Sequence, residues 1–288
     1  MSALNLHVVL WPIQEWPAMG DTWRRAEELG FAGGWVYDHL AWRGQSPWDD
    51  AYATLAAAAA VTSRIRLGTL VTSANFRTPI PTASAARTID RISGGRLTLG
   101  IGAGGAAHTS DGDVLDRDWT PRERADRFAE WVTQMDALLT TAPVTLAGEQ
   151  WSAREVTIAP GLVQQRPPFW IAATGPRGLR LAARLGQGWI ANPHGDDPFA
   201  DVRRQVDGLR DAGEAVGRAV GEVAAMPKLL LTGFSGERWL ESVGAYEDLA
   251  GRYAELGITD VAVHWPRPGT EWDADPAVFE EIASRFGG

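Results

Sequence analysis

Short β-rich runs alternate with longer helical segments along the chain, and this alternation constrains the fold more than any other feature of the sequence. Several of the runs are continuously apolar, as is typical of parallel strands that are buried on both faces. Eight such strand–helix units favour a closed (β/α)8 TIM barrel of the α/β class, and a doubly wound sheet is the structural alternative. The eight expected strands are 6–11, 34–37, 65–72, 96–101, 169–174, 188–191, 228–232 and 260–265.

Five of the expected helices share a start signal, in which a capping side chain precedes a proline at the first helical position. Thr120 also stands three residues before Glu123, the spacing of a capping box. Gly30 follows an apolar stripe and is expected to end the first helix. The five start signals are Ser46-Pro47, Thr78-Pro79, Thr120-Pro121, Asp197-Pro198 and Asp275-Pro276.

The regular alternation breaks after the fourth expected strand, over about residues 103–168. A loop (103–119), a long helix (122–140) and a hairpin-like piece (144–158) replace a simple unit there. An insertion at this point lies on the C-terminal face of a barrel, where barrel active sites are found. We therefore expect one domain over residues 1–288, with the insertion as a candidate lid.

Composition excludes several classes of function. The 288 residues carry a net charge of −9 without a basic cluster, which argues against nucleic acid and anionic membranes as partners. The absence of cysteine excludes disulfides, thiolate zinc sites and a cysteine nucleophile. The histidines lack metal-binding spacing and there is no GxSxG elbow, so we expect neither a metal site nor a serine hydrolase. Without a signal peptide or a long apolar run, the protein is expected to be cytoplasmic.

Asp38 and His39 follow the second expected strand, at the end where a barrel holds its catalytic groups. A histidine can exchange protons near neutral pH, and a neighbouring carboxylate can fix its tautomer or raise its pKa. We interpret the pair as candidate catalytic residues. A structural interpretation, in which Asp38 caps a loop and His39 is a satisfied polar residue at the barrel rim, stays open.

Glycines mark three further places where backbone can approach a ligand. Gly68 inside the third expected strand indicates a bulge or a close approach. The run 100–105 ends the fourth strand but lacks the context of a dinucleotide fingerprint. The segment 172–178 joins the fifth strand to a helix, where backbone N–H groups, the helix dipole and Arg177 favour a phosphate. A plain capped turn is the alternative for this last segment.

Taken in order, these motifs resemble the bacterial luciferase-like monooxygenase superfamily, especially its deazaflavin (coenzyme F420)-dependent branch. The resemblance runs along essentially the whole chain. It implies an oxidoreductase with a (β/α)8 barrel that binds a flavin or deazaflavin at its C-terminal mouth. The residues that carry it are Asp38-His39, SRIRLGTLVTSANFRTP (63–79), ARTIDRISGGRLTLGIGAG (86–104), VQQRPPFWIAATGPRGLRLAARLGQGW (163–189) and GITDVAVHW (257–265).

The resemblance also implies roles for individual residues. His39 would exchange the proton near the hydride-bearing carbon, and a non-proline cis peptide at Leu70-Val71 would brace the tricyclic ring. The turn after the fifth strand would receive the phosphate. The implied cofactor-binding residues are Leu70, Val71, Thr72, Gly102, Ala103, Gly104, Ala173, Thr174, Gly175, Pro176, Arg177 and Gly178.

The substrate cannot be carried over from the sugar-phosphate dehydrogenases of this group. They carry an acidic residue after the glycine pair, whereas this chain has Gly105 there and no carboxylate before Asp111. Fourteen tryptophans, some near expected strand ends, favour an apolar or aromatic substrate instead. The candidate pocket residues are Trp11, Trp42, His108 and His264, although His264 and Trp265 also fit a position at the rim.

We expect an F420-dependent oxidoreductase that transfers a hydride between its cofactor and a small organic molecule. Two alternatives stay open: an FMN-dependent luciferase-like monooxygenase that uses oxygen and a partner flavin reductase, and a barrel that binds flavin without turning it over. The alanine- and arginine-rich composition favours F420, because it is typical of actinobacterial genomes, where that cofactor is common. A separate reductase would regenerate the reduced cofactor, and a homodimer is a further expectation.

Overall fold

The computed structural model describes residues 4–42, 45, 47–105, 110–117 and 119–288. Two compact units account for the chain: unit 1 contains residues 1–11, 21–35 and 170–288, and unit 2 contains residues 12–20 and 36–169. We describe each unit by itself.

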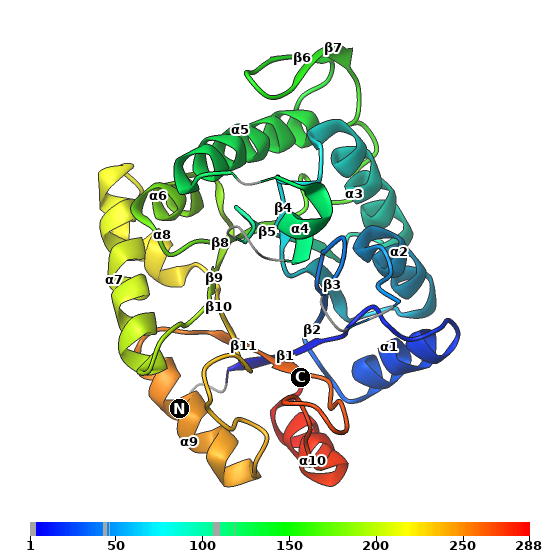
Figure 1. Ribbon diagram of the computed structural model, residues 1–288, viewed down its shortest axis with the longest axis vertical. Helices are drawn as coiled ribbons and strands as arrows, with labels where there is room; N and C mark the ends of the chain where they lie inside the picture. The colour runs from blue at the N-terminus through cyan, green and yellow to red at the C-terminus, as the bar shows by residue number, and fades with distance from the viewer. Residues whose placement is uncertain (1–3, 43–44, 46, 106–109, 118) are drawn as a thin grey trace. The chain divides into compact units, whose positions relative to one another are not determined.

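Unit 1 is built on parallel strands that pair side by side in the order β2, β1, β11, β10, β9 and β8. Helix α7 packs against both α6 and α8, as Figure 1 shows. The strands are β1 (Asn5–Val9), β2 (Gly33–Val36), β8 (Phe169–Ala172), β9 (Gly188–Ala191), β10 (Lys228–Leu231) and β11 (Asp260–His264). The helices are α1 (Ala18–Glu28), α6 (Pro176–Leu185), α7 (Pro198–Ala215), α8 (Val220–Ala225), α9 (Val243–Glu255) and α10 (Pro276–Phe286).

A buried polar chain fixes the register of three strands in unit 1. Trp35 Nε1 donates to His7 Nδ1 at 3.1 Å, and His7 Nε2 lies 2.8 Å from Asp260 Oδ1. A nitrogen that accepts from tryptophan leaves the other ring nitrogen to donate to the carboxylate. His7 is therefore satisfied within the strands β2, β1 and β11.

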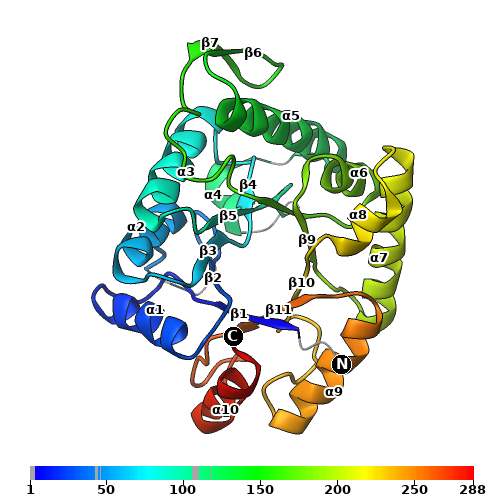
Figure 2. The same cartoon turned by 180° about the vertical axis from the view of Figure 1, so that it is seen from behind.

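Unit 2 holds the remaining strands and the insertion. Strands β3 and β4 both pair in parallel with β5, and α3 packs against α2 and α5, as Figure 2 shows from behind. Strands β6 and β7 form an antiparallel hairpin after α5. The elements are β3 (Arg66–Thr69), β4 (Thr72–Ser73), β5 (Leu97–Gly102), β6 (Val144–Ala147), β7 (Ser152–Val156), α2 (Ala51–Val61), α3 (Pro79–Ser93), α4 (Ser110–Leu115) and α5 (Pro121–Thr140).

The strand order confirms the expected fold class. The order in the sheet is β3-β2-β1-β11-β10-β9-β8-β5-β4, and β3 also pairs with β5. Strands that follow the chain in this cyclic order, with intervening helices, define a closed (β/α)8 barrel. All eight expected strands are present, and the helix and hairpin of the insertion follow the fourth of them.

Three local expectations were wrong. The run 65–72 is divided into β3 and β4, and Gly68 pairs regularly with Thr98, so the interruption lies two residues beyond the glycine. Helix α2 begins at Ala51 with Asp50 as its cap, after the signal expected at Ser46-Pro47, of which Ser46 lies outside the described residues. The loop expected at 103–119 contains the short helix α4.

The other helix boundaries are confirmed. Thr120 and Glu123 form the capping box, and Asp197 and Asp275 cap α7 and α10 with their side chains. Thr78 is the N-cap residue of α3, followed by proline, although no described side-chain bond caps that helix. Gly30 follows α1 with a φ of 83°, a conformation that favours glycine.

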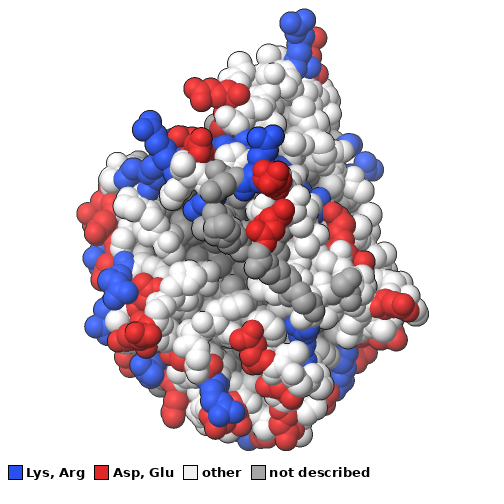
Figure 3. All heavy atoms as spheres, viewed as in Figure 1, with Lys and Arg blue, Asp and Glu red and all other residues white. Residues whose placement is uncertain are grey.

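Two global properties follow from the described residues. None of their helices combines the length and the apolar character that crossing a membrane would need. On the face shown in Figure 3, basic side chains are interspersed with acidic ones.

Candidate active site

Unit 2 contains the cis peptide Leu70–Val71, between β3 and β4, as the resemblance implied. Leu70 and Thr72 are buried, whereas Val71 between them is partly exposed. The Leu70 N–H donates to the carbonyl of Val36 at 2.8 Å, which ties this segment to the end of β2. The backbone thus presents Val71 at a fixed position from which it can support a flat group.

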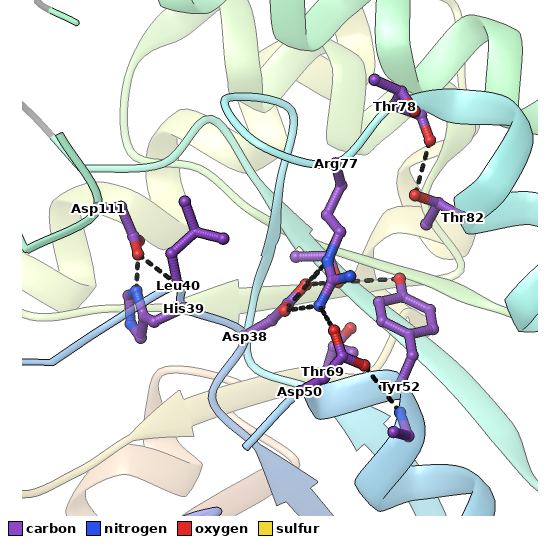
Figure 4. A network of polar contacts seen from close by, with 12 residues as sticks. Asp38, His39, Leu40, Asp50, Tyr52, Thr69, Arg77, Thr78, Thr82 and Asp111 are labelled. Carbon is purple, nitrogen blue, oxygen red and sulfur yellow. Dashed lines mark hydrogen bonds and ion pairs between the residues drawn. The ribbon is translucent and has the colours of Figure 1, made fainter. Parts of the chain in front are cut away.

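Asp38 is fully buried next to this segment and its carboxylate is bound by an arginine (Figure 4). Arg77 donates from Nη2 to Oδ1 at 2.6 Å and from Nε to Oδ2 at 3.1 Å, and Thr72 Oγ1 donates to Oδ2 at 2.8 Å. Burial raises the pKa of Asp38, and the bonds from Arg77 and Thr72 limit this rise. The buried carboxylate of Asp38 is therefore held in place by an ion pair with Arg77 and by the hydrogen bond from Thr72.

His39 points away from Asp38 and binds a different carboxylate (Figure 4). Its Nδ1 lies 2.6 Å from Asp111 Oδ2, and the Leu40 N–H donates to Asp111 Oδ1 at 2.7 Å. A neutral histidine that donates from Nδ1 keeps Nε2 as a proton acceptor. The expectation that the neighbouring Asp38 fixes the tautomer was therefore wrong: Asp111 on α4 does this.

Three aromatic rings surround His39. The centroid of its ring lies 4.9 Å from Trp42 and 5.8 Å from Trp48, both edge-on, and 6.2 Å from Tyr37. Trp42 stacks on both Tyr37 and Trp48. The His39 side chain is still 27% exposed, so a small molecule can reach it. The surroundings of the histidine are thus largely apolar and flat.

The glycine-rich segment after β5 packs on the end of β4. Gly104 has a φ of 77°, and a Cβ there would collide with the Ser73 hydroxyl and the Asn75 amide. Its glycine is therefore required by a close approach of the chain to itself. Ala103 and Gly104 are partly exposed, whereas Gly102 is buried.

In unit 1, the turn between β8 and α6 is an open helix N-terminus. Gly175 is its N-cap without a side-chain cap bond, and a Cβ there would meet no described atom within 4 Å. Thr174, Gly175, Pro176 and Arg177 are exposed. Gly178 lies against Ala173, whose carbonyl accepts from Trp189 Nε1 at 2.9 Å. A fixed strand end followed by an exposed, uncapped helix start is suited to an anion.

The candidate pocket residues Trp11 and His264 lie together in unit 1, beside Trp272 and Phe234. The His264 ring is 6.2 Å from Trp11 and 5.5 Å from Trp272. Burial, followed by the charge of Arg267, lowers the pKa of His264 to about 3. His264 is therefore a buried neutral side chain at the last residue of β11.

The remaining expected residues are less informative. Trp265 is partly exposed and packs edge-on against Phe279 at 5.2 Å, as a rim residue would. His108 lies outside the described residues. Within the described part of the chain, no group of three or more histidines, cysteines or carboxylates could hold a metal.

Two polar residues of the site were not identified from the sequence. Asp111 carries a sequence signal, because it is the first carboxylate after the glycine-rich strand end. Arg77 stands four residues after β4, and only the fold shows that it turns back to Asp38.

The fold and these features together define a class: a (β/α)8 barrel with a cis peptide and a histidine–carboxylate pair at its strand ends. The chain belongs to the luciferase-like monooxygenase family, whose family model matches residues 7–232. This confirms the resemblance described above.

Several known proteins are similar to this chain. An F420-dependent glucose-6-phosphate dehydrogenase of Amycolatopsis mediterranei is 31% identical over 265 residues, which cover 84% of this chain and 78% of that protein. The enzyme of the same name from Beutenbergia cavernae is 38% identical over 175 residues, or 57% of this chain and about half (49%) of that relative's length. The structure of an F420-dependent secondary alcohol dehydrogenase, in complex with an F420–acetone adduct, shares the fold with a TM-score of 0.80 at 18% identity and covers 99% of this chain and 100% of that one.

Proposed function

We propose that this protein is an F420-dependent oxidoreductase that transfers a hydride between the deazaflavin and a small organic molecule. The observation that carries the proposal is the His39–Asp111 pair, which leaves Nε2 of a partly exposed histidine available for proton exchange. Relatives named as F420-dependent dehydrogenases support the choice of cofactor.

The residues that would hold the cofactor fit its chemistry within each unit. In unit 2, the partly exposed Val71 between buried neighbours offers a flat support for a ring. In unit 1, the uncapped start of α6 offers N–H groups and a positive dipole end to a phosphate. The proposed cofactor-binding residues are Leu70, Val71, Thr72, Gly102, Ala103, Gly104, Ala173, Thr174, Gly175, Pro176, Arg177 and Gly178.

F420, when bound, supplies a carbon that accepts or donates a hydride. The chain handles the proton: His39 Nε2 takes it from, or returns it to, the substrate oxygen. Asp111 stabilises the imidazolium that forms, as a carboxylate does for a catalytic histidine. Trp42 and Trp48 exclude water from this side of the histidine. Asp38 does not exchange the proton in this scheme, because Arg77 and Thr72 occupy its carboxylate.

The substrate that fits the site best is small and uncharged, with an apolar or aromatic body. The rings of Tyr37, Trp42 and Trp48 surround His39. In unit 2, the guanidinium that contacts the segment of Asp38 and His39, that of Arg77, is bound by the carboxylates of Asp38 and Asp50. We therefore do not extend glucose 6-phosphate from the relatives to this chain.

The test of the proposed function is the variant His39→Ala. Loss of the proton acceptor should slow hydride transfer on the order of 100-fold, because general acid–base catalysis contributes about that much. Stopped-flow absorbance of the deazaflavin with a secondary alcohol or the matching ketone measures this rate. His194→Ala, an exposed histidine after β9, is the matched control and should keep the wild-type rate.

An FMN-dependent monooxygenase is the second candidate, because the matching family model describes luciferase-like monooxygenases. That enzyme would consume oxygen with reduced FMN from a partner reductase and would bind FMN more tightly than F420. A protein that only binds flavin would show the same rate of cofactor reduction with and without His39.

A further inference from the structure

We propose that Arg77 is a positioning residue for His39 and acts through Asp38. The inference rests on the proposed function, in which His39 exchanges the proton. It concerns a residue that touches neither the His39 ring nor, by its described contacts, any group assigned to the substrate.

The guanidinium of Arg77 forms hydrogen bonds with both carboxylate oxygens of Asp38. Nη2 donates to Oδ1 at 2.6 Å, and Nε lies 3.2 Å from Oδ1 and 3.1 Å from Oδ2. The Asp38 side chain is completely buried and that of Arg77 is 21% exposed. A planar guanidinium can bind both carboxylate oxygens at once, whereas a lysine ammonium acts as a point charge.

Arg77 is itself held by two helices, α2 with its N-cap and α5. Nη2 also donates to Asp50 Oδ2 at 2.7 Å, and Asp50 Oδ1 caps α2 by accepting from the Ala53 N–H at 2.8 Å. The guanidinium lies over the Tyr52 ring, 4.9 Å from its centroid. Trp131 Nε1 on α5 donates to the backbone carbonyl of Arg77 at 2.8 Å. The arginine is therefore fixed at its backbone and at its head group.

The connection to His39 follows from the chain direction. Asp38 and His39 are consecutive, and Figure 4 shows their side chains pointing apart, one toward Arg77 and the other toward Asp111. Anchoring the Asp38 side chain fixes the backbone from which His39 projects, while Asp111 fixes the orientation of the ring. Without Arg77, the imidazole keeps its partner but loses the fixed position of its Cα. A catalytic group displaced by about 1 Å can lose about 100-fold in rate.

The kinetic test uses Arg77→Gln, Arg77→Lys, Asp38→Asn and the double variant Asp38→Asn/Arg77→Gln. Arg77→Gln should lower kcat about 10- to 100-fold while KM and the Kd for F420 change less than about threefold. Arg77→Lys should restore part of the loss. The double variant should be no slower than the slower single variant, because two residues that act through one contact give non-additive effects.

A second variant keeps the inference testable if Arg77→Gln does not fold. Asp50→Asn removes a charge that holds Arg77 but keeps a good helix cap, so α2 should survive. It should lower kcat by about two- to fivefold. Arg166→Gln is the matched control in unit 2, because it breaks the comparable Arg166–Asp136 pair, 2.8 Å apart, and should leave kcat unchanged.

An NMR readout separates this inference from the proposed function. In protein labelled with ¹⁵N-histidine, without cofactor, the His39 ring signals should be shifted or broadened by Arg77→Gln and unaffected by Arg166→Gln. Unchanged His39 signals, unchanged kcat with a lower Tm, or additive losses in the double variant would each overturn the inference. Failure of the wild type to bind F420 would instead contradict the proposed function, and the NMR comparison would still decide the role of Arg77.

Discussion

At the scale of the residue, the site contains two carboxylates with different partners: Asp38, which is adjacent to His39 in sequence and binds Arg77, and Asp111, which the fold brings to His39. The side chains of Asp38 and His39 point apart (Figure 4), so Asp38 does not orient the ring of His39 from the adjacent position. The orienting carboxylate is Asp111, 72 residues further along the chain. Adjacency in sequence therefore assigned the wrong carboxylate partner to His39, whose catalytic role stays a proposal.

Replacing Asp111 by Asn should lower kcat/KM about 10- to 100-fold. An amide can still occupy the space beside His39 Nδ1 but no longer stabilises an imidazolium with a full charge. Steady-state oxidation or reduction of F420 measures the effect. Asp113→Asn, an exposed position on the same helix α4, should behave like the wild type. Equal rates for the Asp111 and Asp113 variants would remove Asp111 from the mechanism.

The lowered pKa of the buried His264 predicts that the folded protein loses stability as the pH falls. Its pKa is lowered from 6.5 to about 3 by burial, so between these pH values the unfolded chain binds a proton that the folded chain does not. The contribution of His264 to stability is therefore complete above pH 6.5 and decreases as the pH falls toward 3. His264→Phe should remove this slope.

The measurement is urea unfolding at several pH values. The free energy of unfolding of the wild type should decrease relative to His264→Phe by about 1.4 kcal/mol per pH unit between about pH 6 and 4. Parallel pH curves for the two proteins would show that His264 is protonated equally in both states.

At the scale of the element, the sequence predicts those strands and helix caps that are determined by residues close together in the chain. Buried parallel strands need apolar runs, and all eight were found. Caps made by neighbouring residues, such as Thr120 with Glu123, were also found. The start of α2 was misplaced because Asp50 both caps the helix and binds Arg77, a contact between residues 27 positions apart. The interruption at Leu70–Val71 came from the resemblance, since nothing in residues 65–72 alone marks it.

The exposed N-terminus of α6, which has no side-chain cap, is the proposed phosphate site. Arg177→Ala should weaken F420 binding about tenfold through the loss of a charge-assisted hydrogen bond in the first turn of α6. Arg180→Ala, an exposed position one turn further along the same helix, should leave the affinity within about twofold. Fluorescence titration measures both affinities. The same Kd for wild type and Arg177→Ala would withdraw the phosphate assignment.

At the scale of the whole molecule, the alternation of strands and helices was sufficient to predict the barrel, and the strand order confirms it. The chain contains no cysteine, so it has no thiol or disulfide that could take part in redox chemistry. The proposed hydride transfer therefore depends on a bound cofactor. The single domain over residues 1–288, the homodimer and the separate reductase stay predictions. The substrate could not be predicted by name, because its recognition depends on rings brought together by folding, of which only Trp42 was singled out from the sequence.

The choice of cofactor is the central claim, and a direct titration tests it. Purified protein freed of cofactor is titrated with F420 and, separately, with FMN while the quenching of tryptophan fluorescence is followed. The proposed function predicts saturable quenching by F420 with a Kd at least about tenfold lower than that for FMN. Tight binding of FMN without any response to F420 would contradict it.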